Sequence, residues 1–365
     1  MRHLYTDAPP LIASTARPSL AQALQLKLDR RSAISGRMGE LEPLAVRLGL
    51  IQNTLRPRLR QPQLLVFAGD HGLAVDLATP AERTSATRVD DVLQARVPLP
   101  VFAHHQGLTL NLVDAGLATP MPVTPGVLAR KIAHGTRNCR MAQAMSHEQL
   151  RAALRAGSEI ADALPGNVLG CAALGLGSVE AAALVISRVT GLPLRQILNA
   201  GDTMASMTLE HHMVILQVAL ARHSAAEDPI EVLGAFGGFE TAMMVGAMLR
   251  AAEKRHLILV DGLPACAALI VASHIASAMT DYCVFCRSSN HAGLDRVLAA
   301  FHSTALLALG MDSLDGTGIA LSWPLLAAAA SLLSDLTDEA SDSADGPAPA
   351  SQLDGGAFLT RPAGL

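Results

Sequence analysis

The segment 314–318 (LDGTG) contains an acid that could act in catalysis. An aspartate before Gly-Thr-Gly is often only a turn residue, and Asp315 could simply cap a helix that we expect to begin near Thr317. A carboxylate at such a turn can also take a proton from a substrate or stabilise a developing positive charge. The residue type leaves both roles open.

Two further groups of polar residues follow glycine-rich turns. Asp70 and His71 are adjacent in GDHG (69–72), which is poor spacing for metal ligands. We therefore expect no metal site and interpret them as a hydrogen-bonded structural pair at the edge of a cleft. Glu240 in GGFE is a candidate second acid, although the two preceding glycines are also explained by a tight strand exit.

The elements that position these residues follow from the apolar pattern. Helical patterns separate several short β-rich runs, and the clearest helix covers 146–164, where Ser146 and Gln149 form a capping box. This alternation predicts an α/β fold, a doubly wound, Rossmann-like parallel sheet of about six strands. Right-handed crossovers place the turns after the strands along one edge, where a ligand cleft is expected. The β-rich runs are 63–72, 108–116, 166–177, 230–240, 256–264 and 282–289.

The ends of the chain show a different pattern. Residues 1–60 have helical patterns without a convincing strand, and 319–335 has the pattern of a buried helix. We expect these ends to form a smaller helical domain beside a large α/β domain of residues 61–318. Six acids and no basic residue occur from 335 to 354, so we expect 336–365 to be an acidic, disordered tail.

The composition limits the kinds of partner. The chain has 365 residues, 50% of them hydrophobic, and a formal net charge of −4. It has no long basic run, so we expect no nucleic-acid binding. Lysine occurs only at positions 27, 131 and 254, so a bound phosphate would need backbone N–H groups, arginine, serine or histidine.

The sequence also predicts the compartment. The apolar segment 319–333 is too short for a bilayer, which needs roughly 20 residues, and 258–279 is interrupted by Asp261, Pro264 and His274. The first residues lack the apolar core of a secretory signal. Five cysteines without framework spacing indicate reduced thiols. We expect a cytoplasmic protein that does not bind a membrane.

Seven segments between about residues 66 and 325, taken in order, resemble the nicotinate-nucleotide:dimethylbenzimidazole phosphoribosyltransferase family. Each segment is weak by itself, but the ordered set is specific for the family. They are VFAGDHG (66–72), KIAHGTRN (131–138), LGLGSVEAAAL (174–184), LGAFGGFETAMMVGAMLRAA (233–252), VDGLPACAAL (260–269), YCVFCRSS (282–289) and LDGTGIAL (314–321).

The resemblance implies a homodimeric enzyme that needs no metal or cofactor. It would move the 5-phosphoribosyl group from nicotinate mononucleotide to 5,6-dimethylbenzimidazole, giving α-ribazole 5′-phosphate and nicotinate for the nucleotide loop of cobalamin. The attacking ring must lose a proton, and in the family a Glu in a GEGTG turn is placed to take it. By position Asp315 is that residue, one methylene shorter.

The resemblance also suggests residues that bind the substrates. His212 falls near a lysine of the family, while Arg287 is a new residue that could supply charge to the nucleotide phosphate. The predicted substrate-binding residues are Gly175, Gly177, Ser178, His212, Gly262, Arg287, Ser289, Gly293, Gly316 and Gly318.

Departures from the family pattern leave alternatives open. A loop Glu of the family is Ala173 here, and the 73–100 region differs on the benzimidazole side. One alternative is the same chemistry with another aromatic base, such as a purine, another benzimidazole or a phenol. Another is a non-catalytic relative that binds a nucleotide or ribazole. A dinucleotide-binding oxidoreductase is disfavoured because no G-x-G-x-x-G follows the first strand.

Overall fold

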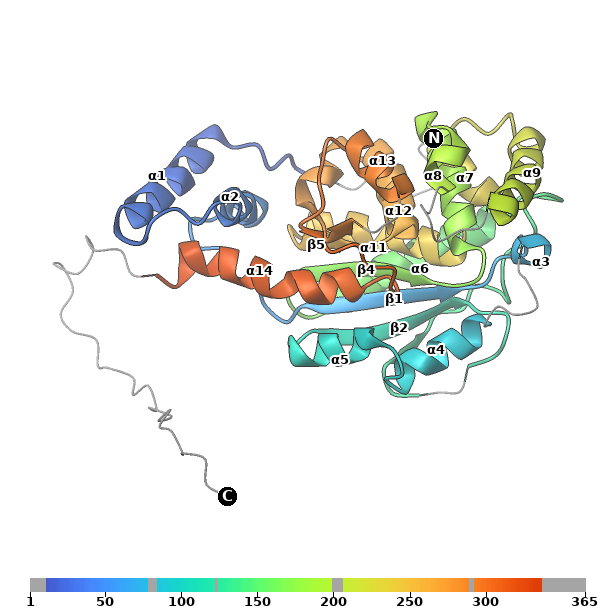
Figure 1. Cartoon of the computed structure of the whole chain (residues 1–365), viewed down its shortest axis with the longest axis horizontal. Coiled ribbons are helices and arrows are strands. Elements are labelled where there is room, and N and C mark those ends of the chain that lie inside the picture. The colour runs from blue at the N-terminus through green and yellow to red at the C-terminus, as the bar shows by residue number, and fades with distance from the viewer. Residues whose placement is uncertain (1–10, 78–83, 122–123, 199–205, 289–291, 337–365) are drawn as a thin grey trace, which may run out of the picture.

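The computed structural model describes residues 11–77, 84–121, 124–198, 206–288 and 292–336. Its centre is a six-stranded sheet in the order β3-β2-β1-β4-β5-β6, in which every neighbouring pair is parallel (Figure 1). The strands are β1 Gln63–Gly69, β2 Thr109–Gly116, β3 Val127–Ala129, β4 Val168–Leu174, β5 Leu257–Val260 and β6 Cys283–Phe285. The α/β class and the parallel sheet are therefore confirmed.

The central strands are buried on both faces. All seven residues of β1 and all seven of β4 are buried, as the continuous apolar runs predicted. The helices α4 and α5 lie on one side of the sheet and α11 and α12 on the other (Figure 1). The helices are α1 Pro18–Ser35, α2 Leu41–Gln52, α3 Ala74–Leu77, α4 Ser85–Leu93, α5 Pro98–His105, α6 His147–Ala163, α7 Ser178–Thr190, α8 Leu194–Leu198, α9 Ser206–Arg222, α10 Pro229–Phe236, α11 Phe239–Glu253, α12 Leu263–Ile275, α13 Ala292–Ala300 and α14 Thr317–Ser334; a 3₁₀ helix covers Ser277–Tyr282, and β7 Arg287–Ser288 pairs with β8 Leu307–Ala308.

One predicted strand is wrong. Residues 230–240 form α10 and the start of α11, separated by Gly237 and Gly238. Asp228 accepts a hydrogen bond from the N–H of Ile230, and Pro229 is the first helical residue, so the local sequence starts a helix. Within 230–240 only Glu231 is exposed, and such a nearly continuous buried run cannot be separated from a buried strand by periodicity. The sixth strand is instead the short β3.

The helix that carries Glu240 is held tightly. The capping box predicted at Ser146 is confirmed at the start of α6. A Cβ at Gly157 of α6 would collide with the carbonyl of Met243, and one at Gly246 of α11 would collide with α6 in turn. This close crossing fixes α11, and with it Glu240, over the sheet.

The two ends of the chain meet, as the sequence suggested. Helices α1 and α2 lie beside α14 (Figure 1), and Lys27 of α1 donates to the carbonyl of Leu333 at 2.9 Å. Their separation into a second domain stays a prediction. The proposed tail lies outside the described residues, apart from Leu336.

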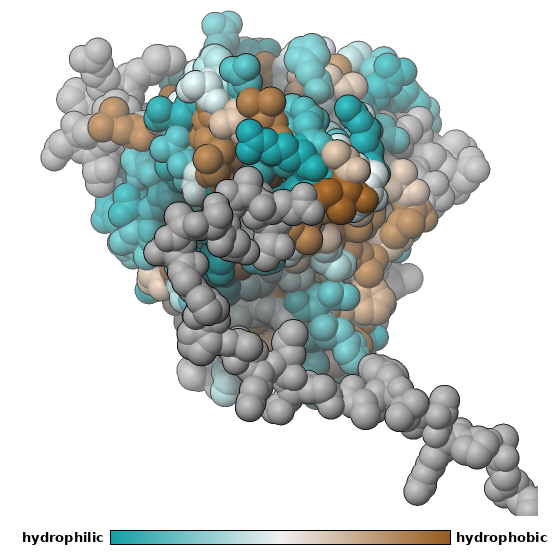
Figure 2. Space-filling model, turned by 90° about the vertical axis from the view of Figure 1, so that its left-hand side faces the viewer, coloured by the Kyte–Doolittle hydropathy of each residue, from teal (hydrophilic) through white to brown (hydrophobic). Residues whose placement is uncertain are grey.

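The surface at this end of the molecule is mixed. Polar and apolar side chains both occur over it (Figure 2). Leu26 and Ile34 of α1 are exposed. The expectation that the apolar segment 319–333 is too short for a bilayer is wrong, because α14 has 18 residues and could cross a membrane by length and composition. In the structure 56% of this helix is buried inside the fold.

Candidate functional site

The turns after the strands converge at one edge of the sheet. Gly175 lies so close to the end of β1 that a Cβ there would collide with the carbonyl of Gly69. Gly177 adopts φ +82° and lies next to the side chain of His71. Ser178 begins α7, and its hydroxyl donates to the carbonyl of Gly175 at 3.0 Å. The hydroxyl of Ser178 therefore stabilises the turn, and the turn leads directly into the N-terminus of α7.

A second turn, after β5, carries a buried carboxylate that sequence reasoning missed. Asp261 is fully buried, and its Oδ1 accepts from Nε of Arg287 at 2.7 Å. Its Oδ2 accepts from the N–H of Gly316 at 2.7 Å and of Gly318 at 2.9 Å. Asp261 thus satisfies backbone donors at the start of α14. An acid directly after a buried parallel strand was the available signal.

This arrangement removes one interpretation of Asp315. Gly316 occupies the cap position of α14, and no side chain forms the usual cap hydrogen bond there. The capping work is done by Asp261, which lies 55 residues before Gly316 in the chain. Asp315 is therefore not the helix cap, and its carboxylate is left for other contacts.

The Asp315 carboxylate lies directly over Gly262, where any Cβ would collide with it. Its Oδ1 accepts from a terminal nitrogen of Arg287 at 2.9 Å, and 21% of its side chain is exposed. Burial and then the charge of Asp261 raise the pKa of Asp315 to about 7, although Arg287 acts in the opposite direction. A carboxyl group that titrates near neutral pH is suited to accept and return a proton.

Arg287 is engaged by the protein. Besides its bonds to the two carboxylates, it donates to Oγ and to the carbonyl of Ser313, both at 2.9 Å, and to the carbonyl of Met311 at 3.4 Å. These contacts use its whole guanidinium group, so this geometry gives no support to the expectation that Arg287 binds a phosphate. Gly318 leaves room for its side chain, since a Cβ there would lie 2.8 Å from Cγ of Arg287.

A second charged group lies at the end of β1. Nε2 of His71 lies 2.9 Å from Oε1 of Glu240, and Thr241 donates to the same oxygen at 3.0 Å. Both partners of this pair are buried. Burial favours the neutral forms, but the partner together with nearby charges and hydrogen bonds outweighs it, so the pKa of His71 is raised and that of Glu240 is lowered.

The expected pairing of Asp70 with His71 is replaced by separate contacts. Asp70 accepts from the hydroxyl of Ser85 at 2.5 Å and from the N–H of Ala118 at 2.8 Å. The Ser85 hydroxyl also accepts from the N–H of Leu176, which ties α4 to the turn after β4. Asp70 thus organises the loops, while His71 pairs with Glu240.

The other predicted site residues fall in several places. His212 of α9 is buried, and its Nδ1 lies 3.4 Å from Glu180 in the first turn of α7, close to Ser178. Gly293 packs against the backbone of α8 at Ile197, which explains a glycine there without a ligand. Ser289 lies outside the described residues. Gly262, Gly316 and Gly318 surround the Asp261–Arg287–Asp315 cluster.

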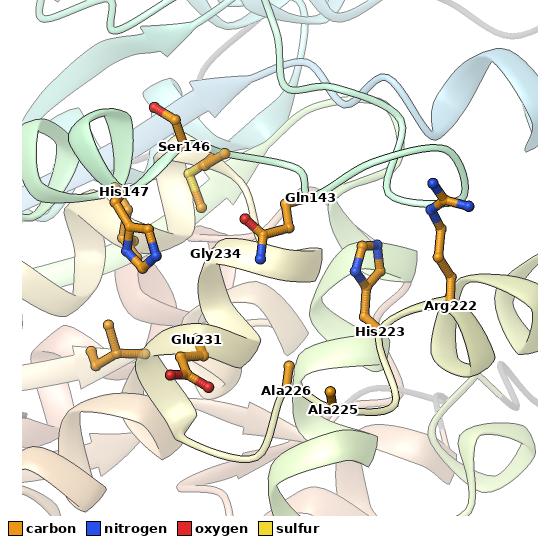
Figure 3. A pocket seen from close by; sticks show the side chains of 12 residues that line it. Gln143, Ser146, His147, Arg222, His223, Ala225, Ala226, Glu231 and Gly234 are labelled. Carbon is orange, nitrogen blue, oxygen red and sulfur yellow. The ribbon is translucent and has the colours of Figure 1, made fainter.

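A cavity of about 320 Å³ lies elsewhere, between the start of α6, the end of α9 and α10 (Figure 3). Its polar lining includes Gln143, His147, Arg222, His223 and Glu231. None of the residues of the two charged clusters lines it. Within the described ranges, no group of three or more His, Cys, Asp or Glu residues is placed to hold a metal ion.

Comparisons with known proteins point in one direction. The family model described as Phosphoribosyltransferase (DBI PRT) matches residues 13–342. The chain is 42% identical over 337 residues to a protein of Cupriavidus taiwanensis named nicotinate-nucleotide–dimethylbenzimidazole phosphoribosyltransferase, covering 91% of this chain and 96% of that one. A protein of the same name from Janthinobacterium sp. is 36% identical over 336 residues, covering 91% and 97%. The crystal structure of CobT from Thermus thermophilus is similar with a TM-score of 0.80 and 28% identity, over 87% of this chain and 96% of that one.

Proposed function

Since the chain belongs to this phosphoribosyltransferase family, we propose that it transfers the 5-phosphoribosyl group of nicotinate mononucleotide to 5,6-dimethylbenzimidazole. The products are α-ribazole 5′-phosphate and nicotinate, which places the enzyme in the assembly of the cobalamin nucleotide loop. Following the resemblance, we also propose a cytoplasmic homodimer that uses no metal or cofactor.

The observation that carries this proposal is the excess of negative charge around Asp315. Two carboxylates, Asp261 and Asp315, share the single guanidinium of Arg287. When both are ionised the cluster has a net charge of −1, and its partly exposed member is Asp315. Such a site can stabilise a cationic ring and take its proton, because the charge is held in a poorly solvated place.

The reaction can be written around this carboxylate. One ring nitrogen of the base attacks C1′ of the ribose, the bond from C1′ to the nicotinate nitrogen breaks, and its electron pair leaves with nicotinate. Attack from the opposite face changes the β-nucleotide into an α-nucleotide. The proton on the other ring nitrogen passes to Asp315, which later releases it to solvent.

The phosphate of the nucleotide is assigned to the turn after β4. Gly175 and Gly177 bring the backbone close to the N-terminus of α7, where N–H groups and the helix dipole favour an anion. His212 lies beside this first turn and pairs with Glu180 at 3.4 Å, so its contact with the phosphate stays a prediction from the resemblance.

The test is a transfer assay with the full chain. Nicotinate mononucleotide is supplied with dimethylbenzimidazole, another benzimidazole, a purine or a phenol, and nicotinate and nucleoside products are measured by chromatography. We expect nicotinate release that depends on the base and equals product formation. Binding of the nucleotide by calorimetry, with no release for any base, would refute the enzyme and favour the non-catalytic relative.

A further inference from the structure

The environment of Arg287 suggests a role beyond packing. Its side chain is 4% exposed and lies between the end of β6 and the start of α14. It contacts Asp261 on one side and Asp315 on the other, and Ser313 and Met311 fix the rest of the guanidinium. An arginine with all its N–H groups engaged is held in one orientation, so it can fix the direction of a carboxylate.

Asp261 has support that does not depend on Arg287. The N–H groups of Gly316 and Gly318 both donate to its Oδ2. Backbone donors favour the charged carboxylate. If Arg287 lost its charge, the start of α14 would therefore still be anchored by Asp261, and two negative groups would face each other without a cation.

No other described group near Asp315 would replace the positive charge of Arg287. Asp312, in the preceding loop, adds a further negative influence on Asp315. Cys266 of α12 is buried, and its thiol pKa is raised well above the usual value, so it stays neutral. Ser313 is uncharged. Among the described residues that act on Asp315, Arg287 is thus the cation.

We propose that Arg287 is a positioning residue of the transfer reaction: shared between Asp261 and Asp315, it holds the Asp315 carboxylate over Gly262 and keeps it negatively charged for proton transfer. The proposal rests on the proposed function, since it assigns Arg287 to the base of that reaction. Asp261 shares the positive charge of Arg287, so Arg287 cannot fully offset the negative charge of Asp315.

Three variants separate this role from packing. Arg287→Gln removes the cation, so burial and Asp261 act on Asp315 unopposed, and its pKa rises. Asp261→Asn removes the competing anion, so Arg287 acts mainly on Asp315, and its pKa falls. The double variant Asp261→Asn/Arg287→Gln removes one charge of each sign. In it, the amide introduced at position 261 can still accept from the α14 backbone and can donate to the amide introduced at position 287.

The readout is the acid limb of the pH profile of kcat/KM. We expect it to move up by about one unit or more in Arg287→Gln and down in Asp261→Asn, since a neighbouring charge shifts a pKa by about 1–3 units. In the double variant it should return toward wild type. Arg287→Lys keeps the charge but loses the fork of donors, so its limb should stay near wild type while kcat falls. KM for nicotinate mononucleotide should change little.

A direct titration accompanies the kinetics. With ¹³C-labelled aspartate, the carboxyl signal of Asp315 is identified by its loss in Asp315→Asn. Its pKa should be higher in Arg287→Gln, lower in Asp261→Asn and close to the wild-type value in the double variant. Melting curves report whether each variant folds. Equal losses of kcat with no shift, or shifts of the same sign in both single variants, would overturn the proposal and leave Arg287 a packing residue. An inactive wild type would instead refute the proposed function, and the titration would still decide whether Arg287 and Asp261 control the charge of Asp315.

Discussion

The His71–Glu240 pair and the Asp261–Arg287–Asp315 cluster lie at the same edge of the sheet and use similar residues. In the pair, a histidine whose pKa is raised meets one carboxylate, and both side chains are at most 1% exposed. In the cluster, two anions share one cation, and one anion is 21% exposed. The pair is closed, and each partner favours the charged form of the other. The cluster is unbalanced and open, so one carboxylate titrates near neutral pH.

This difference indicates how buried charge can serve two purposes in one fold. A closed pair fixes the start of α11 against the end of β1, since His71 follows β1, Glu240 lies in the first turn of α11, and both side chains are buried. An open, unbalanced cluster keeps charge available for a reacting group. We therefore predict a structural role for Glu240, which the following variants can test.

The largest effect is expected at the open carboxylate. Asp315→Asn should lower kcat and kcat/KM together by about 10²–10⁴-fold, because the amide cannot take the ring proton or carry its countercharge. Binding of nicotinate mononucleotide should persist. Folding should also persist, since Asp261 and not Asp315 serves the start of α14. Transfer kinetics, calorimetry and a melting curve check these three points, and full activity in a folded Asn variant would remove Asp315 from the mechanism.

At the closed pair the expected loss is in stability. Glu240→Gln leaves His71 without its anion in a buried place, so we expect a loss of about 3 kcal/mol in the free energy of unfolding. Thr241→Val is the matched control: it removes one hydrogen bond to the same oxygen and should cost about 1 kcal/mol. Denaturant unfolding measures both. If folded Glu240→Gln retained its stability but lost turnover, Glu240 would have a catalytic and not a structural role.

The two clusters should also respond to pH in different ways. The pKa of Asp315 is about 7 in the folded chain, against about 3.9 for an unfolded aspartate. Between these values the unfolded state has released a proton that the folded state retains, so Asp315 lowers stability as the pH rises. The melting temperature of Asp315→Asn relative to wild type should therefore increase from about pH 5 to about pH 8.

For the His71–Glu240 pair, the stabilisation should be largest within a limited pH range. The lowered pKa of Glu240 contributes stability above about 4.3, lost as the pH falls through the folded value, and the raised pKa of His71 contributes stability below about 6.5, lost as the pH rises through its folded value. The cost of Glu240→Gln should thus be greatest near about pH 5.5 and smaller on either side. A cost that did not depend on pH would mean that the pair is not charged.

The sequence predicted the strands of the sheet better than the contacts within the two clusters. Continuous apolar runs predicted β1, β4, β5 and β6, because a strand buried on both faces must be apolar throughout. The β-rich run 108–116 also predicted β2, although its first three residues are not buried. The same reasoning failed at 230–240, where two buried helices are equally apolar. Turn residues could be placed at one edge, since parallel strands end together.

The contacts within that edge were beyond the sequence. LDGTG contains one aspartate and opens a helix, so local rules assign the cap to Asp315; the cap comes instead from Asp261, which only the sheet brings close. Arg287 was assigned to a phosphate by its charge alone. Its two carboxylate partners lie 26 and 28 residues away in the chain, and no local pattern encodes that distance.

The smallest expected change comes from lengthening the base, with Asp315→Gln as the matched control that has the same length and no charge. The Asp315 carboxylate lies against Gly262, so an added methylene cannot extend inward and must move the carboxylate toward the open side. Asp315→Glu should therefore keep kcat within about tenfold of wild type, because a shift of about 1 Å can cost up to about a hundredfold and the incoming ring can adjust to part of it. Its more solvated carboxylate should titrate lower, which moves the acid limb of kcat/KM to lower pH. Asp315→Gln should be as inactive as Asp315→Asn. If Glu and Gln were equally inactive, the exact position of the carboxylate over Gly262 would matter more than the charge imbalance that separates this cluster from the His71–Glu240 pair.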